Sequence, residues 1–215
     1  MIVDPFDNER EIGISVRKTA APMTVPQKEI DGLSPIVKDM FLQWRDFLYS
    51  RVTFNLPDSE IHAAGHCERV LLYALIIGHE IFGNNRYALT ALAHAAVFHD
   101  TRRQDDSLDT GHGARAAVYY RQFCDQTPDV DLIPEAQLMM KYHDIADMRG
   151  KVGIKCDFHG PLPRMFKLYD IFKDADALDR WRLGNDGLDP KYLRTGQAKA
   201  MMDYSHRIVR EALGE

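Results

Sequence analysis

Histidine and aspartate side chains recur in this sequence at positions where helices should present their buried faces. The most marked case is the pair His99-Asp100, which ends an apolar stretch. Leu92, Ala96 and His99 are spaced by four and three residues, so the imidazole projects from the face that packs into the core. A carboxylate in such surroundings is unfavourable unless a metal ion or a fixed cation compensates it. The pair is therefore either a metal chelate or the capped end of a helix.

Two further segments place a ligand-type side chain on a predicted buried face. His66 lies four residues before Val70 on the apolar stripe of a long helix, and Asp176 follows Phe172 by four residues near the end of another. Asp174 is two residues from Asp176 and points almost the opposite way. We therefore expect Asp174 to be solvated or paired on the outside of its helix.

Together these segments predict a metal site built from nitrogen and carboxylate ligands without a thiolate. Such a set suits divalent Mn, Fe, Co, Ni or Zn, with coordination positions left for water. Cys67 is not expected to contribute, because adjacent residues of a helix face different directions. The predicted ligands are His66, His99, Asp100 and Asp176.

The other histidines of this region are more ambiguous. His62 precedes His66 by one helical turn, and it could be a ligand, a residue behind the ligands or an exposed residue. His94 lies roughly 140° around the helix from His99, which predicts a structural role. His143 follows a helix at core spacing, where a ligand role and a buried hydrogen bond to a backbone carbonyl explain it equally well.

A polar loop directly after Asp100 carries clustered positive charge. His112 falls in the first turn of the next predicted helix, where free backbone N–H groups and the helix dipole form a local anion site. Arg102, Arg103 and Arg115 could add charge there and bind phosphate. For each arginine taken singly, an ordinary ion pair in a solvated loop is the simpler interpretation. Their clustering after Asp100 favours the phosphate-binding hypothesis.

The order of these residues resembles that of the HD superfamily of metal-dependent phosphohydrolases. His66, then His99-Asp100, then Asp176 look like the H…HD…D signature of that family over roughly residues 55–182. The resemblance implies an all-α HD-domain helical bundle that holds one metal ion with those four residues. It also implies hydrolysis of phosphomonoester, phosphodiester or nucleotide substrates by a metal-activated water. The Gly-Tyr-Pro segment of cyclic-di-GMP hydrolases and the Glu-Asp pair of (p)ppGpp hydrolases are missing, which disfavours both substrates.

The chemistry implied by this resemblance gives each predicted site residue a role. A bound divalent ion lowers the pKa of coordinated water and polarises a phosphoryl oxygen. Asp100 would orient the water, and His112 or His143 would give the leaving oxygen its proton. The three arginines would neutralise charge on the phosphate. The expected partner is a small phosphorylated molecule.

Two other functions remain open from the sequence. Some proteins similar to this one carry two further histidines between the HD pair and the final aspartate, and these bind a second metal ion; di-iron oxygenases of the fold are among them. His112 and His143 occupy that interval here, so a second metal there and an oxidation reaction form the main alternative. The arginine cluster favours the hydrolase, because it suits an anionic substrate. A protein that binds a metal or ligand without turnover is the third hypothesis.

Helices joined by loops are predicted to position these residues. Helices are expected over about 35–48, 58–82, 85–99, 134–143, 163–181 and 195–213, with another that begins near 110 and a loop over 150–163. Residues 1–30 carry several prolines, which predicts an irregular N-terminal extension with at most a short strand at 12–16. Residues 31–215 are expected to form a single HD-type domain.

Composition limits the classes of protein to which the chain can belong. At 215 residues, with 45% hydrophobic and 27% charged residues, it is typical of a soluble globular protein. The net charge of −5 argues against an extended nucleic-acid surface. The three cysteines show no paired spacing, and no apolar run suits a signal peptide or a membrane span. A cytoplasmic protein is predicted, and its oligomeric state stays open, with a homodimer as one option.

Overall fold

The computed structural model describes residues 24–215, and all regular structure in that part of the chain is helical. This confirms the predicted all-α class. None of its helices has the length and apolar character needed to cross a membrane. The strand predicted at 12–16 lies outside the described residues. In chain order the elements are α1 (Gln27–Asp31), α2 (Pro35–Arg51), α3 (Ala64–Phe82), α4 (Arg86–Phe98), α5 (His112–Gln126), α6 (Pro134–Tyr142), α7 (Asp147–Asp157), α8 (Leu162–Leu178), the 3-10 turns η1 (Asp179–Leu183) and η2 (Pro190–Tyr192), α9 (Gly196–Ala200) and α10 (Met202–Ala212).

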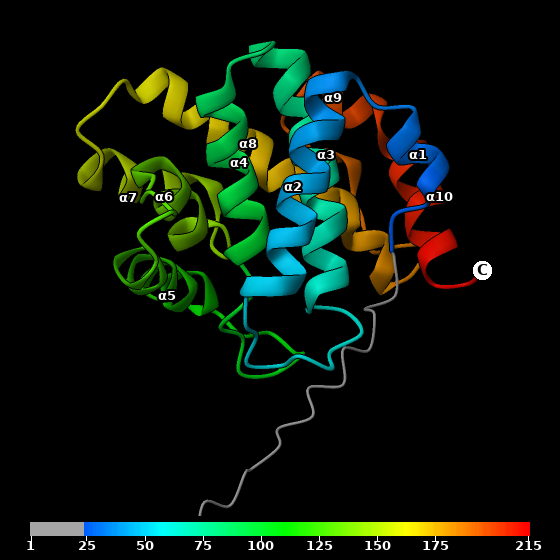
Figure 1. The fold of residues 1–215 in the computed structure, drawn as a ribbon, viewed down its shortest axis with the longest axis horizontal. Helices are drawn as coiled ribbons and strands as arrows, with labels where there is room; N and C mark the ends of the chain where they lie inside the picture. Colours follow the sequence, from blue (N-terminus) through cyan, green and yellow to red (C-terminus); the bar gives the residue numbers. More distant parts are fainter. Residues whose placement is uncertain (1–23) are drawn as a thin grey trace, which may run out of the picture.

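Helices α3 and α4 form the centre of the molecule, and α2 and α8 pack against them (Figure 1). Every residue of α4 from Ala91 to Phe98 is buried, and α3 is buried from His66 to Leu75. A helix that is apolar on all sides must be covered by neighbours on every side. The start of α3 and the end of α4 therefore lie inside the protein, where they bring polar side chains into the core.

Helix α7 occupies most of the segment predicted to be a loop over 150–163. In the structure, Gly150 and Gly153 permit close packing of this helix. A Cβ atom on Gly150 would lie 2.1 Å from the Tyr169 hydroxyl oxygen, and one on Gly153 would lie 2.5 Å from the Tyr142 ring. The two glycines thus allow α7 to approach both α6 and α8.

Two other predicted helices differ at their ends. Helix α3 begins at Ala64 rather than near residue 58. The residues before it form turns, in which the Ser59 hydroxyl oxygen accepts hydrogen bonds from the backbone N–H groups of Ile61 and His62. The predicted C-terminal helix is divided at Met201 into α9 and α10.

Gly113, in the first turn of α5, lies against the end of α6. A Cβ atom there would be 2.3 Å from the Met140 carbonyl oxygen and 2.8 Å from His143 Nδ1. Because a backbone carbonyl cannot rotate aside, Gly113→Ala is expected to lower the free energy of unfolding by about 2 kcal/mol. Gly196→Ala is the control, since its added Cβ meets nothing within 4 Å; it should change stability by at most about 1 kcal/mol. Urea unfolding measures both, and equal stabilities would contradict this prediction.

Candidate metal centre

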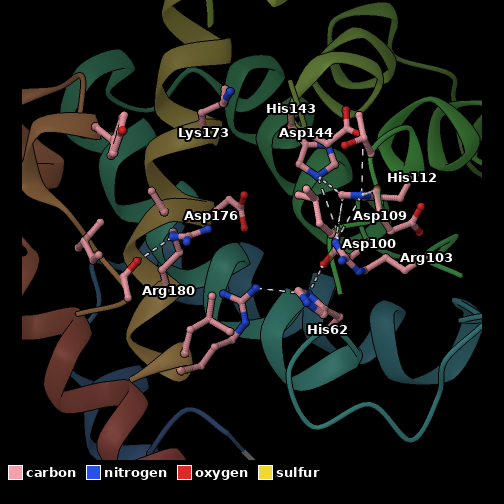
Figure 2. Close-up of a pocket in the computed structure, with 18 of the residues that line it drawn as sticks. His62, Asp100, Arg103, Asp109, His112, His143, Asp144, Lys173, Asp176 and Arg180 are labelled. Atoms are coloured by element: carbon pink, nitrogen blue, oxygen red, sulfur yellow. Dashed lines mark hydrogen bonds and ion pairs between the residues drawn. The ribbon is translucent and has the colours of Figure 1, made fainter. Parts of the chain in front are cut away.

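Six histidine and aspartate side chains meet where five helices begin or end. Figure 2 shows four of them at the edge of a cavity, namely Asp100, His112, His143 and Asp176. All except Asp176 are buried, and the Asp176 side chain is 28% exposed. Helix packing produces this convergence, because the residues are spread over more than half of the sequence. The six are His66 in the first turn of α3, His99 and Asp100 directly after α4, His112 at the start of α5, His143 directly after α6 and Asp176 in the last turn of α8.

The first group of donor atoms, site A, contains the four predicted ligands. His66 Nε2 lies 3.0 Å from His99 Nε2 and 3.3 Å from Asp176 Oδ1. Asp100 Oδ2 is 3.6 Å from His66 Nε2. Donor atoms around a tetrahedral ion with bonds of about 2.0 Å are about 3.3 Å apart. The separations in site A therefore suit a single ion, although ligation itself stays a prediction.

A second group, site B, lies on the other side of the Asp100 carboxylate. Asp100 Oδ1 is 3.0 Å from His112 Nε2 and 3.7 Å from His143 Nε2. The two Nε2 atoms are 2.9 Å apart. Asp100 thus directs one oxygen toward each group, as a carboxylate does when it bridges two ions. Site B offers three donor atoms against four in site A, so site A is the more complete of the two.

Hydrogen bonds at Nδ1 fix the orientation of four rings. His99, His112 and His143 each donate to the backbone carbonyl oxygen three residues earlier, at 2.9, 2.6 and 2.8 Å. His66 donates to Asp179 Oδ2 at 2.7 Å. Because these acceptors have no proton to give, each neutral ring carries its proton on Nδ1 and keeps the Nε2 lone pair free. Histidine ligands of metal ions are oriented in this way, and the donor set therefore fits a divalent ion.

Burial and neighbouring charges set the protonation of the donors. Burial lowers the pKa of His99 to about 3, so this ring is neutral at pH 7. Burial alone would raise the pKa of Asp100, but His99, His112 and His143 hold it well below its usual value. Burial acts to lower the pKa of His143, yet Asp100 and Asp176 raise it overall. An ion in site B therefore competes with a proton on His143.

Asp179 fixes the position of His66, and the sequence analysis did not assign it a role. Arg69 donates to both of its oxygens, from Nε at 2.6 Å and from Nη2 at 2.9 Å. Burial alone would raise the pKa of Asp179, but Arg69 and His66 hold it at about 2. Asp179 follows Asp176 by three residues and so shares its helix face, which was the available signal.

The anion site predicted at the start of α5 is filled by a side chain of the protein itself. Asp144 accepts hydrogen bonds from the backbone N–H groups of Gly111 and Gly113. Its carboxylate satisfies free N–H groups and faces the positive end of the helix dipole. Asp144 therefore anchors the turn that carries His112, and these N–H groups are not available to a phosphate.

Of the three predicted phosphate-binding arginines, the structure brings only Arg103 to the centre. Its side chain is buried and lines the cavity that adjoins sites A and B. Arg102 instead stacks on the Tyr119 ring, with its guanidinium carbon 3.2 Å from the ring centroid. Arg115 is paired with Asp109. Neither Arg102 nor Arg115 lines the cavity, because Arg102 is held by Tyr119 and Arg115 by Asp109.

The cavity next to the two sites has a volume of about 760 Å³. A cavity of this size accommodates an organic ligand rather than a single ion. Asp100, His112, His143 and Asp176 form part of its wall. Four further cationic side chains, for which the sequence predicted no role, also line it, namely Lys173, Arg180, Arg182 and Arg194. Figure 2 labels the first two.

Three further expectations from the sequence can be compared with the structure. His62 is buried, and its Nδ1 lies 3.0 Å from Asp100 Oδ2, so it sits beside the ligands rather than in solvent. His94 hydrogen-bonds a tyrosine hydroxyl at 2.7 Å, as expected of a structural residue. Asp174 is paired, which was one of the two expected alternatives, but it is fully buried rather than on the outside. It accepts hydrogen bonds from Arg194, which covers that side of α8.

Comparison of the chain with protein-family models, with curated proteins and with solved structures gives no match. The likeness to the HD superfamily is therefore carried by the residues of this chain alone.

Proposed function

We propose that this protein is an HD-type metal-dependent phosphohydrolase that cleaves a nucleotide or another small phosphoester. One observation carries the proposal: four histidines have Nδ1 tied to an acceptor and Nε2 within 4.0 Å of the Asp100 carboxylate. A core histidine can also donate Nδ1–H to a carbonyl, but the convergence of four Nε2 atoms on one buried carboxylate fits a metal centre. The cationic side chains of the cavity wall support an anionic substrate.

Each residue around site A has a separate role in the proposed hydrolysis. A divalent Mn, Fe, Co, Ni or Zn ion bound there supplies a water of lowered pKa and polarises a phosphoryl oxygen. Asp100 accepts a hydrogen bond from that water and directs it toward the phosphorus. Arg103 stabilises the charge that develops on the phosphoryl oxygens. When site A alone is occupied, His112 or His143 gives a proton to the leaving oxygen.

Site B supports a second candidate function. His112 and His143 with Asp100 Oδ1 offer three donor atoms for a second ion. Two bridged irons would make oxidation of a small substrate the alternative, as the resemblance to di-iron oxygenases of this fold implies. Arg103, Arg180 and Arg182 in the cavity wall can bind an anionic substrate, which favours hydrolysis over oxidation. Metal binding without turnover is the remaining hypothesis, and it predicts the same metal content with no reaction rate.

Elemental analysis of protein purified without added metal tests the proposal. We expect about one ion per chain in the wild type and in the double variant His112→Ala/His143→Ala, and none in Asp176→Ala. Phosphate release from a panel of nucleotides and phosphomonoesters is expected from the wild type and not from Asp176→Ala. His159→Ala is the matched control, because this histidine is exposed and does not line the cavity.

The same measurements separate the three hypotheses. Two irons per chain, one of them lost in the double variant, together with substrate-dependent oxygen consumption would favour the oxygenase and overturn the hydrolase. A full metal content with neither phosphate release nor oxygen consumption would favour the third hypothesis, a protein that binds a metal without turnover. Retention of the ion in Asp176→Ala would contradict site A itself.

We also propose that the protein works in the cytoplasm. Cys67, Cys124 and Cys156 are all free thiols. A reducing compartment preserves three unpaired thiols in one chain.

A further inference from the structure

Arg182 is a buried cation in the wall of the cavity. It lies in η1, and its side chain is only 4% exposed. Its Nε–H donates to the Ile61 carbonyl oxygen at 2.6 Å, which fixes the position of the guanidinium group. The cavity wall at this point also includes His62 and Asp176. Arg182 is thus held rigidly beside site A.

Arg182 shares its nearest carboxylate with another arginine. Arg69 already donates to both oxygens of Asp179, and His66 donates to one of them. Arg182 Nη1 is 3.6 Å from Asp179 Oδ2 and has no hydrogen-bond partner. Within residues 24–215, no other carboxylate lies within 4.0 Å of Arg182. Two guanidinium groups therefore face one carboxylate, and Asp179 gives Arg182 no hydrogen bond.

The Nη2 atom of Arg182 also lacks a good acceptor. It lies 3.4 Å from His62 Nδ1, and that same Nδ1 is 3.0 Å from Asp100 Oδ2. A neutral imidazole nitrogen that donates its proton to Asp100 cannot accept one from Arg182. Because the contact between His62 Nδ1 and Asp100 is the shorter, the Nη2 group of Arg182 keeps its N–H donors available for a ligand.

We propose that Arg182 binds a terminal phosphate group of the substrate beside site A. This inference rests on the proposed function and narrows its substrate class to phosphate monoesters. Arg103 approaches Asp100 from the Oδ1 side, with Nη1 at 3.9 Å, whereas Arg182 reaches His62 on the Oδ2 side. A monoester phosphate carries about two negative charges at pH 7, and a diester carries one. Two fixed guanidinium groups on opposite sides of Asp100 therefore favour the monoester.

Calorimetric titration of the metal-loaded protein with inorganic phosphate tests this assignment without any turnover. Arg182→Gln is expected to raise the Kd of phosphate at least about tenfold. Arg182→Lys should raise it by a smaller factor, because it keeps the charge and loses the two-pronged donor geometry. Arg121→Gln is the control, since this arginine is exposed on α5 and does not line the cavity; its Kd should stay within about twofold of wild type.

Hydrolysis of a monoester and a diester provides a second readout. With p-nitrophenyl phosphate, Arg182→Gln should raise KM more than it lowers kcat, and with bis(p-nitrophenyl) phosphate the change in KM should be smaller. A purely structural role for Arg182 would not separate the two substrates in this way. Metal content and circular dichroism of each variant show whether the fold and the ion are retained.

Phosphate affinities that are equal in wild type, Arg182→Lys and Arg182→Gln overturn the proposal. If Arg182→Gln loses its ion or its fold, the lysine variant decides: a Kd raised at least about threefold supports the assignment, and an unchanged Kd overturns it. Phosphate binding that depends on Arg182 in a protein that hydrolyses nothing would keep this anion site and remove the hydrolase. Hydrolysis that is indifferent to Arg182 would remove the anion site alone.

Discussion

Asp100→Asn is expected to abolish metal binding, as Asp176→Ala does, and to lower the rate of phosphoester hydrolysis by about 100-fold or more. The carboxylate oxygens face site A and site B separately, at 3.6 Å from His66 Nε2 and 3.0 Å from His112 Nε2. The amide has the same size, but it loses the negative charge and one of the two accepting oxygens. Elemental analysis and a phosphate-release assay measure the two effects.

A second Asp→Asn substitution, away from the centre, shows whether the loss of metal and rate is specific to Asp100. Asp129 is exposed and pairs with Arg51, so Asp129→Asn should leave metal content and rate unchanged. Circular dichroism should show the same helical content in both variants. A full complement of metal in Asp100→Asn would show that the carboxylate is dispensable, and the assignment of both sites would then fail.

Asp179→Ala is expected to lower the free energy of unfolding by about 3–5 kcal/mol. The substitution leaves the Arg69 guanidinium buried without its carboxylate, and it also removes the acceptor that orients His66. A buried charge without a partner is one of the few single changes with so large an effect. Urea unfolding in the presence of a chelator measures the loss without the contribution of a bound ion.

Two variants show that the loss comes from the buried charge. Asp129→Ala breaks an exposed ion pair and should leave the free energy of unfolding close to that of the wild type. Arg69→Met/Asp179→Ala removes both partners and should recover part of the loss. Full recovery is not expected, because Arg182 would still face the vacated position. A loss below about 1 kcal/mol in Asp179→Ala would contradict the argument.

Helix periodicity was sufficient to place three of the predicted ligands on buried helix faces. His66, His99 and Asp176 belong to three separate segments, and each was placed on a buried face by its spacing from apolar neighbours. The structure brings their donor atoms within 3.9 Å of one another. The all-α class follows from the same period and is confirmed.

Side chains in irregular segments could not be placed by the same reasoning. Arg102 and Arg103 are adjacent, yet one stacks on Tyr119 and the other lines the cavity, and no local pattern distinguishes them. Asp174 points away from Asp176 as its spacing requires, but a segment twenty residues later covers that side of α8. These outcomes depend on contacts between distant parts of the chain, which periodicity does not encode.

The acceptors of the four Nδ1–H groups lie at different sequence distances from their histidines. The two sites can therefore form at different stages of folding. His99, His112 and His143 are aimed by carbonyls three residues away, so their rings can be oriented as soon as each turn has formed. His66 depends on Asp179, 113 residues later. During synthesis site B can therefore exist before α8 has emerged, whereas site A closes only when η1 has packed against α3. An ion held in site A joins an early helix to a late one, and its binding energy is added to the stability of the completed chain alone.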